Sequence, residues 1–261
     1  MFINMTIDPF VVVIAIILLA CIILFSFLYL KYKRKKYKNY VLDLIIILAI
    51  LGLVVVSRNY FLNNQREYAF DYESLPETSE EGYVFINDNE PFFNDEDWIK
   101  GELHFSDLDN LGRCGEAYAL LNYDLLPEED RGSIDSVMPS GWQVAKYEDL
   151  IQDKFLFNRC HLIAFELCGE NANILNLITG TRYMNLNMVL YENQVSSYIH
   201  RTGNPVLYRV TPVFIDRELV ARGVLIEAKS LYDNQVRFCV YFYNEQPGIE
   251  IDYNTGHSHR K

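Results

Sequence analysis

The sequence of 261 residues predicts a membrane anchor of two helices, followed by an α+β domain built on an antiparallel sheet. Two apolar runs near the amino terminus predict the anchor. Alternating apolar and polar residues near the carboxyl terminus predict the sheet, and a stripe at helical spacing just before them predicts a helix. We expect three segments: an anchor over residues 1–59, an acidic linker or stalk over 60–107, and a folded domain over 108–261.

The first apolar run covers residues 10–30 and carries no charge over its 21 residues. About 20 apolar residues suffice to cross a bilayer as a helix. A cleaved signal peptide is the alternative, and it would need a basic start, a shorter apolar core and a small-residue cleavage site. Because the first nine residues contain no Lys or Arg, we predict a retained transmembrane helix.

The second apolar run, Val41 to Val56, is shorter and contains Asp43. Its 16 residues are marginal for a span, and a charge within a span is costly. An amphipathic helix lying at the membrane surface is the alternative. We predict a second span because the run is flanked by aromatic residues of the kind that occupy membrane interfaces, namely Tyr37, Tyr40, Tyr60 and Phe61.

A basic cluster separates the two runs, with six positive charges in the eight residues from Lys31 to Lys38. Basic clusters also occur as nucleic-acid patches. Between two apolar runs, a cytoplasmic loop is the better interpretation, since such loops are rich in Lys and Arg. The sequence therefore predicts a multi-pass protein of the cell membrane. Everything after residue 57 would lie outside the cytoplasm.

The net charge of −12 is concentrated just after the predicted anchor. Residues 60–110 hold 14 acidic and 2 basic side chains and show few strand or helix signals beyond residues 83–86, which is typical of a solvated spacer. This acidity argues against DNA binding by the whole surface, although a local cleft lined by arginines remains compatible with it.

The carboxyl-terminal domain has one clear helix and three clear strands. Residues 205–215, 219–231 and 236–243 alternate apolar and polar side chains and predict an antiparallel meander. Arg182 to His200 carries an apolar stripe and predicts a helix, which Gly203-Asn204-Pro205 ends. Before it, Phe155 to Leu167 predicts a short strand-like run that is interrupted at residues 158–161.

The chain has five cysteines, of which four lie after the predicted anchor. An even number permits disulfides, but none of them has the spacing of a Cys-x-x-Cys or metal motif. We expect small buried apolar side chains.

The most informative stretch is Phe157-Asn158-Arg159-Cys160-His161-Leu162-Ile163-Ala164-Phe165. A neutral histidine beside an arginine suits removal of a proton from water near a phosphate, whereas a lone histidine is often structural. Downstream, Asn185 and Glu192 are seven residues apart and lie on one face of the predicted helix. An amide oxygen suits Mg²⁺, which keeps several waters and takes few protein ligands. A helix cap or core amide is the alternative for Asn185.

Taken together, these motifs resemble the DNA/RNA non-specific endonuclease family, whose ββα-metal finger carries an Asp-Arg-Gly-His signature. Within it, the chain is similar to the DNA-entry nuclease branch and its membrane-anchored relatives. The resemblance covers residues 108–256 and includes further motifs in the same order: Gly112-Arg113-Cys114-Gly115, Arg131-Gly132-Ser133, Pro139-Ser140-Gly141-Trp142, Asn244-Glu245-Gln246-Pro247-Gly248 and Asp252-Tyr253-Asn254-Thr255-Gly256.

The resemblance implies a role for each matching residue. His161 matches the general base, Arg159 the motif arginine and Asn185 the single protein ligand of Mg²⁺. Asn176 matches an active-site asparagine, and Glu192 a carboxylate that orients metal-bound water. Arg159 and Arg131 are expected to hold the phosphate, and Arg182 is either a further contact or a surface residue.

The implied reaction is Mg²⁺-dependent hydrolysis of phosphodiester bonds in DNA, and also in RNA, leaving 5′-phosphate ends, with Mn²⁺ able to substitute for Mg²⁺. Two positions depart from the signature: Asn158 replaces its Asp and Cys160 its Gly. The Asp is not the base, so its loss bears on scaffolding more than on chemistry. A cysteine at position 160 raises the question whether the backbone there needs the conformational freedom of glycine.

Two other functions stay open. The chain could be a membrane-tethered nucleic-acid receptor that has lost catalysis, or an antibacterial nuclease toxin. The expected partners are nucleic acid and the lipid bilayer, together with a DNA-uptake or secretion machinery. The expected roles are DNA uptake and DNA degradation.

Overall fold

The computed structural model describes residues 9–33, 40–41, 43–47, 70–94, 97 and 103–261, with side chains described from Cys21 onward. The chain divides into two compact units, Met1–Ala69 and Phe70–Lys261. Each unit is described by itself.

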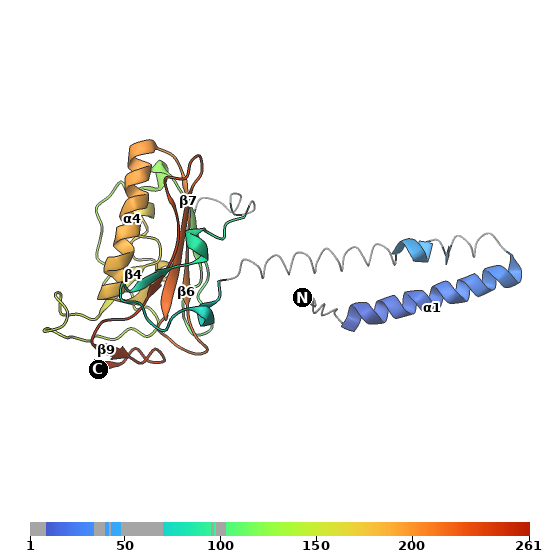
Figure 1. Cartoon of the computed structure of the whole chain (residues 1–261), viewed down its shortest axis with the longest axis horizontal. Coiled ribbons are helices and arrows are strands. Elements are labelled where there is room, and N and C mark those ends of the chain that lie inside the picture. Colours follow the sequence, from blue (N-terminus) through green and yellow to red (C-terminus); the bar gives the residue numbers. More distant parts are fainter. Residues whose placement is uncertain (1–8, 34–39, 42, 48–69, 95–96, 98–102) are drawn as a thin grey trace. The chain divides into compact units, whose positions relative to one another are not determined.

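The first unit contains helix α1, which extends from Pro9 to Tyr32 (Figure 1). Within the described part of the chain, no helix combines the length and the apolar character that a membrane span requires. The first predicted span lies within α1, but half of its side chains fall outside the described residues. Most of the second predicted span and of the basic cluster also lies outside them. The two-span topology therefore stays a prediction.

The second unit is built on an antiparallel sheet of six strands in the order β1-β8-β7-β6-β3-β2. The predicted meander is confirmed, because consecutive strands β6, β7 and β8 pair antiparallel at its centre. The strand bounds are Tyr83–Phe85 for β1, Leu103–Phe105 for β2, Ala117–Leu121 for β3, Val206–Val213 for β6, Gly223–Ser230 for β7 and Arg237–Tyr243 for β8.

Both faces of this sheet are covered. On one face, helix α4 (Arg182–Thr202) lies along the strands and buries Met184, Met188, Val195 and Ile199 in the main core. On the other face, side chains from residues 70–92 pack on Leu225, Tyr241 and Tyr243. Strands covered on both faces become almost continuously apolar, and all but one residue of β7 is buried accordingly.

The acidic stretch expected as a spacer contributes two strands to the sheet. β1 pairs with β8 at one edge and β2 with β3 at the other. The structure thus differs from the expectation over the described residues of 60–107. The apolar run over residues 83–86 had indicated β1, whereas β2 has only three residues, too few for an alternating pattern to be visible among acidic neighbours.

A separate strand pair and α4 form a ββα unit. β4 (Phe157–His161) pairs antiparallel with β5 (Leu177–Thr181), and β5 leads directly into α4. Thr181 caps the helix by accepting a hydrogen bond from the Met184 amide, and Gly203 ends it with a positive φ. The helix prediction is confirmed. The predicted interruption of the strand at residues 158–161 is wrong, because the motif itself is the strand.

The remaining elements are short. Between β4 and β5 lie α3 (Phe165–Cys168) and the 3₁₀ turn η5 (Ile174–Asn176). Other 3₁₀ turns are η1 (Tyr72–Ser74), η2 (Asn87–Asn89) and η4 (Tyr123–Leu125), and the chain ends in the hairpin of β9 (Ile249–Ile251) and β10 (Ser258–Arg260).

All five cysteines are free, and the four in the second unit are buried, as the sequence predicted.

Candidate active site

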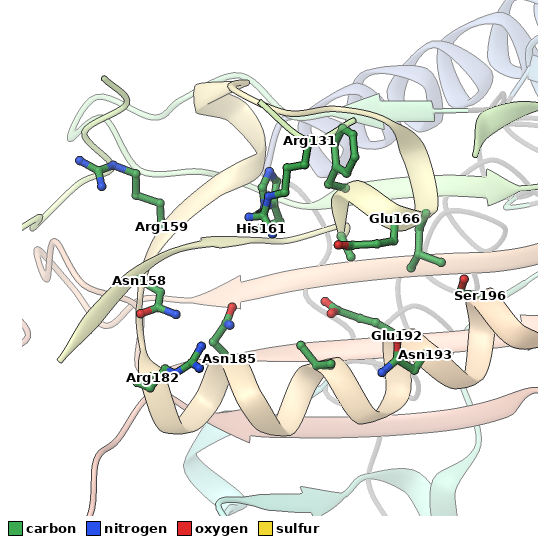
Figure 2. Close-up of a pocket in the computed structure, with 14 residues that line it drawn as sticks. Arg131, Asn158, Arg159, His161, Glu166, Arg182, Asn185, Glu192, Asn193 and Ser196 are labelled. Atoms are coloured by element: carbon green, nitrogen blue, oxygen red, sulfur yellow. Dashed lines mark hydrogen bonds between the residues drawn. The ribbon is translucent and has the colours of Figure 1, made fainter. Parts of the chain in front are cut away.

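A pocket of about 270 Å³ lies at the ββα unit, between β4, α3 and one face of α4 (Figure 2). It collects polar and charged side chains from distant parts of the sequence. Its polar and charged lining residues are Arg131, Asn158, Arg159, His161, Glu166, Arg182, Asn185, Glu192, Asn193 and Ser196.

His161, at the end of β4, has one ring nitrogen tethered and the other directed at an arginine. Its Nε2 lies 2.8 Å from the backbone oxygen of Asn171, and its Nδ1 lies 3.5 Å from Nη2 of Arg131. A carbonyl oxygen can only accept a hydrogen bond, so Nε2 carries the ring proton, and the lone pair of Nδ1 accepts the long contact from Arg131. His161 is 7% exposed. Burial, together with the positive charge of Arg131, lowers the pKa of His161 below its usual value.

Helix α4 presents Asn185 and Glu192 to the same pocket, as their spacing predicted. Figure 2 shows both side chains directed toward the strand β4 side of the pocket. Among the described residues, the half-buried carboxylate of Glu192 has no hydrogen-bond or ion-pair partner. The pKa of Glu192 is raised to about 8, mainly by burial and also by the neighbouring Glu166, while the charge of Arg131 opposes the shift.

Cys160 contacts Asn185 from the neighbouring strand. Its Sγ lies 3.0 Å from Oδ1 of Asn185. Burial raises the pKa of the Cys160 thiol well above its usual range, so the sulfur keeps its proton and donates. Cys160 is not among the residues with positive φ. Glycine's conformational freedom is therefore not needed at this position.

Arg159 lines the pocket wall, but its guanidinium is held by a neighbouring loop. Its Nε and Nη2 donate to the carbonyl oxygens of Val137 and Asp135, at 2.5 and 2.7 Å. The guanidinium also lies 4.2 Å from the ring centroid of Trp142. Figure 2 shows it directed away from His161 and Asn185. The geometry assigns Arg159 to the loop that carries Arg131, rather than to the centre of the pocket.

The other two arginines differ in availability. Arg131 is exposed and its guanidinium reaches His161. Arg182 also lines the pocket, but it forms an ion pair with Asp153 at the first turn of α4. Arg131 is consequently the better placed of the two to meet a phosphate.

A family model described as DNA/RNA non-specific endonuclease matches residues 94–231, more than half of the chain. The chain belongs to this family. It is therefore a non-specific endonuclease, a hydrolase of phosphodiester bonds, and nucleic acid is its substrate class.

Solved nuclease structures share the fold of this endonuclease. NucA from Streptococcus agalactiae with a bound magnesium ion is 25% identical, with a TM-score of 0.62, over 77% of this chain and 97% of that one. The Sda1 nuclease with a bound zinc ion is 25% identical, with a TM-score of 0.57, over 74% of this chain and 100% of that one. No curated protein matches the sequence.

The donor groups of the endonuclease fit a hydrated divalent cation. Within the described residues, no three His, Cys, Asp or Glu side chains form a ligand cluster. Such a cluster would be typical of a dehydrated transition metal. A neutral amide oxygen from Asn185 and an unpaired carboxylate at Glu192 instead suit Mg²⁺, which retains most of its waters.

Asn176 is placed outside the pocket lining. It is fully buried, and its Oδ1 and Nδ2 bond to the backbone N–H and C=O of Ile163, both at 2.9 Å. These bonds fix the chain two residues after His161.

Two groups at the site were not singled out from the sequence. Glu166, on α3, directs its carboxylate into the pocket, as Figure 2 shows. Asn171 supplies the carbonyl that tethers His161. Three asparagines lie between residues 171 and 176, and this enrichment could have indicated that Asn171 belongs to the site. Glu166 had no such signal, because it lies in the short helix α3, which the sequence pattern did not predict.

Proposed function

We propose that this endonuclease hydrolyses DNA and RNA with Mg²⁺ as its metal ion, with Mn²⁺ able to substitute, and with His161 as the general base. The tethered ring of His161 beside Asn185 and Glu192 is the observation that carries this proposal. The product would have a 5′-phosphate end, as the resemblance to the family implies.

His161 would accept a proton from the attacking water at Nδ1. The Asn171 carbonyl supports this role because it holds the proton of the neutral ring on Nε2. The lowered pKa of His161 supports it as well, since the ring then stays neutral and able to accept a proton near neutral pH.

Asn185 would be a direct ligand of the metal ion, and Glu192 would hold a water bound to it. When bound, Mg²⁺ polarises the phosphate and stabilises charge on the departing oxygen. The cation would also favour the ionised form of Glu192, whose pKa is raised in its absence.

Arg131 would bind the scissile phosphate. Its guanidinium is exposed and lies beside His161, which would bring base and phosphate together. Arg159 would act by holding the loop of Arg131, and Asn176 by fixing the backbone after His161. Arg182 would need to leave Asp153 before it could contact a phosphate.

We further propose that the endonuclease is anchored in the cell membrane and faces outward. The uncharged run over residues 10–30 and the basic cluster after it support this location. A role in DNA uptake or degradation, with an uptake or secretion machinery as partner, would follow from it.

The test uses the purified full-length chain in detergent, incubated with plasmid DNA or with RNA, in Mg²⁺, Mn²⁺ or EDTA. We expect cleavage only with a divalent cation, and a loss of about 10²–10⁴-fold in rate for His161→Ala. Asn185→Ala should need more Mg²⁺. Cleavage in EDTA, or an unimpaired and correctly folded His161→Ala, would contradict the proposal.

A further inference from the structure

Cys160 is buried at the junction between β4 and α4, directly beneath the Asn185 side chain. Besides the 3.0 Å contact with Oδ1 of Asn185, its sulfur lies 3.7 Å from Sδ of Met188. The residue is 1% exposed, so water does not compete for the thiol. A thiol donates one hydrogen bond, and an amide oxygen can accept two. One lone pair of Oδ1 thus meets the thiol, and the other stays available.

The thiol also determines which end of the amide is presented. In a flipped amide, the NH₂ group would face the sulfur, which is only a weak acceptor. An NH₂ group cannot bind a cation. A donor at residue 160 therefore favours the amide orientation in which the oxygen is available.

The fold makes room for this side chain on the neighbouring strand. Gly180 pairs with Asn158 and lies beside Cys160. A Cβ atom at residue 180 would lie 2.6 Å from the Cβ of Cys160 and 3.2 Å from its Sγ. Such distances are too short for two side chains to coexist. A side chain at 160 is therefore accommodated because residue 180 has none.

We propose that Cys160 is a positioning residue for the metal ion: its thiol holds the Asn185 amide so that Oδ1 is presented to the cation. The inference rests on the proposed function, in which Asn185 is the metal ligand. It gives a role to the cysteine that replaces the glycine of the family signature. A cysteine that merely filled space would have no effect on cation affinity.

The test measures Mn²⁺ binding to the full-length chain without nucleic acid, from the electron paramagnetic resonance signal of free Mn²⁺. Groups that hydrogen-bond a metal ligand typically contribute about 10–100-fold to metal affinity. Because a thiol is a weak donor, we expect Cys160→Ala to weaken binding by about 10-fold, the lower end of that range. Cys160→Ser, which keeps a donor, should recover most of the affinity.

Cys168→Ala is the matched control. Cys168 is a buried thiol whose hydrogen bonds are to backbone atoms, including the oxygens of Ile163 and Ala164, and not to Asn185, so its removal should leave Mn²⁺ affinity unchanged. A second control combines Cys160→Ala with Asn185→Ala. If the thiol acts through the amide, the double variant should bind no more weakly than Asn185→Ala alone.

The outcomes separate the inference from the proposed function. If the parent chain binds no Mn²⁺ and cleaves in EDTA, the proposed function fails. If the parent binds Mn²⁺ and a folded Cys160→Ala binds it equally well, the positioning role is overturned. Should the alanine variant fail to fold, Cys160→Gly removes the same thiol and decides the question by the same comparison.

Discussion

The Nη2 atom of Arg131 lies 3.5 Å from Nδ1 of His161, so a permanent positive charge stands beside the lone pair of the ring. This arrangement disfavours a second positive charge on the imidazole. Burial lowers the pKa of His161, and the charge of Arg131 lowers it further. The endonuclease should therefore keep its base neutral at pH values below the usual pKa of a histidine.

The acid limb of the pH profile should depend on Arg131. A base must be neutral to accept a proton, so kcat/KM should fall only as the pH drops through the lowered pKa of His161. Arg131→Gln removes the positive charge and should move this limb to higher pH, besides lowering the rate. Arg217→Gln, an exposed arginine outside the pocket, should leave the limb in place. If the acid limb of Arg131→Gln lay at the same pH as that of the parent, Arg131 would not influence the pKa of His161 in the working enzyme.

Arg159 should support catalysis through the loop it holds. Lysine cannot reproduce the two hydrogen bonds to Val137 and Asp135, each worth about 1.5–3 kcal/mol for a charged donor. We expect Arg159→Lys to lower kcat/KM by about 10-fold or more and to expose residues 130–138 to limited proteolysis, with mass spectrometry to locate the cuts. Weaker activity with an unchanged digestion pattern would instead indicate direct contact with the substrate.

Glu166 should oppose the entry of nucleic acid when no metal ion is bound. Its carboxylate and that of Glu192 face one pocket. Because the pKa of Glu192 is raised to about 8 without a cation, an entering phosphate meets mainly the negative charge of Glu166. We expect Glu166→Gln to tighten DNA binding in EDTA by about 5-fold, and to have a smaller effect when Mg²⁺ is present. Fluorescence anisotropy with a short labelled duplex measures both conditions. Glu170 lies outside the pocket lining, so Glu170→Gln should bind DNA as tightly as the parent chain does.

Asn176 should contribute to the stability of the fold rather than directly to catalysis. Asn176→Ala leaves the backbone N–H of Ile163 without its partner and the C=O of Ile163 with only the weak thiol donor of Cys168, in a buried site. Each loss costs about 1–3 kcal/mol, so we expect the free energy of unfolding to fall by about 2–5 kcal/mol in urea denaturation. Asn254→Ala, in an exposed turn, should be nearly neutral. An Asn176→Ala protein with parental stability and no activity would restore the catalytic role that the family resemblance implies.

The predicted topology can be tested on cells that produce the chain. If the basic cluster stays in the cytoplasm and both apolar runs span the membrane, protease added to intact cells without their wall should release a fragment near residues 60–261. If the domain is protected until the membrane is permeabilised, it faces the cytoplasm.

Local patterns predicted the parts of the fold that depend on neighbours in sequence. The meander from Val206 to Tyr243 and helix α4 were visible because their apolar residues repeat with the period of a strand or a helix. β1 was visible only as the short apolar run over residues 83–86, and β2 was not visible, because each consists of three residues and depends on pairing with another strand.

At the site, too, the sequence predicted what depends on neighbouring residues and missed what depends on distant ones. The spacing of Asn185 and Glu192 placed both on one face of α4, and both line the pocket with His161. The oxygen atoms that hold Arg159 and Arg182 belong to residues 22 or more positions away and follow no periodic pattern. From the sequence, Arg159 was expected to hold the phosphate and Arg182 either to contact it or to lie at the surface, whereas in the structure both guanidinium groups are engaged by the protein.

The direct junction between β5 and α4 restricts where this chain can change in length. The helix turns by about 100° for each residue, so a single residue inserted after Thr181 would rotate Asn185 and Glu192 away from His161. An insertion near Gly169, in the irregular connection between the two strands, would leave that alignment intact. Homologues should accordingly gain and lose residues before β5 and keep a fixed count from Thr181 to Glu192.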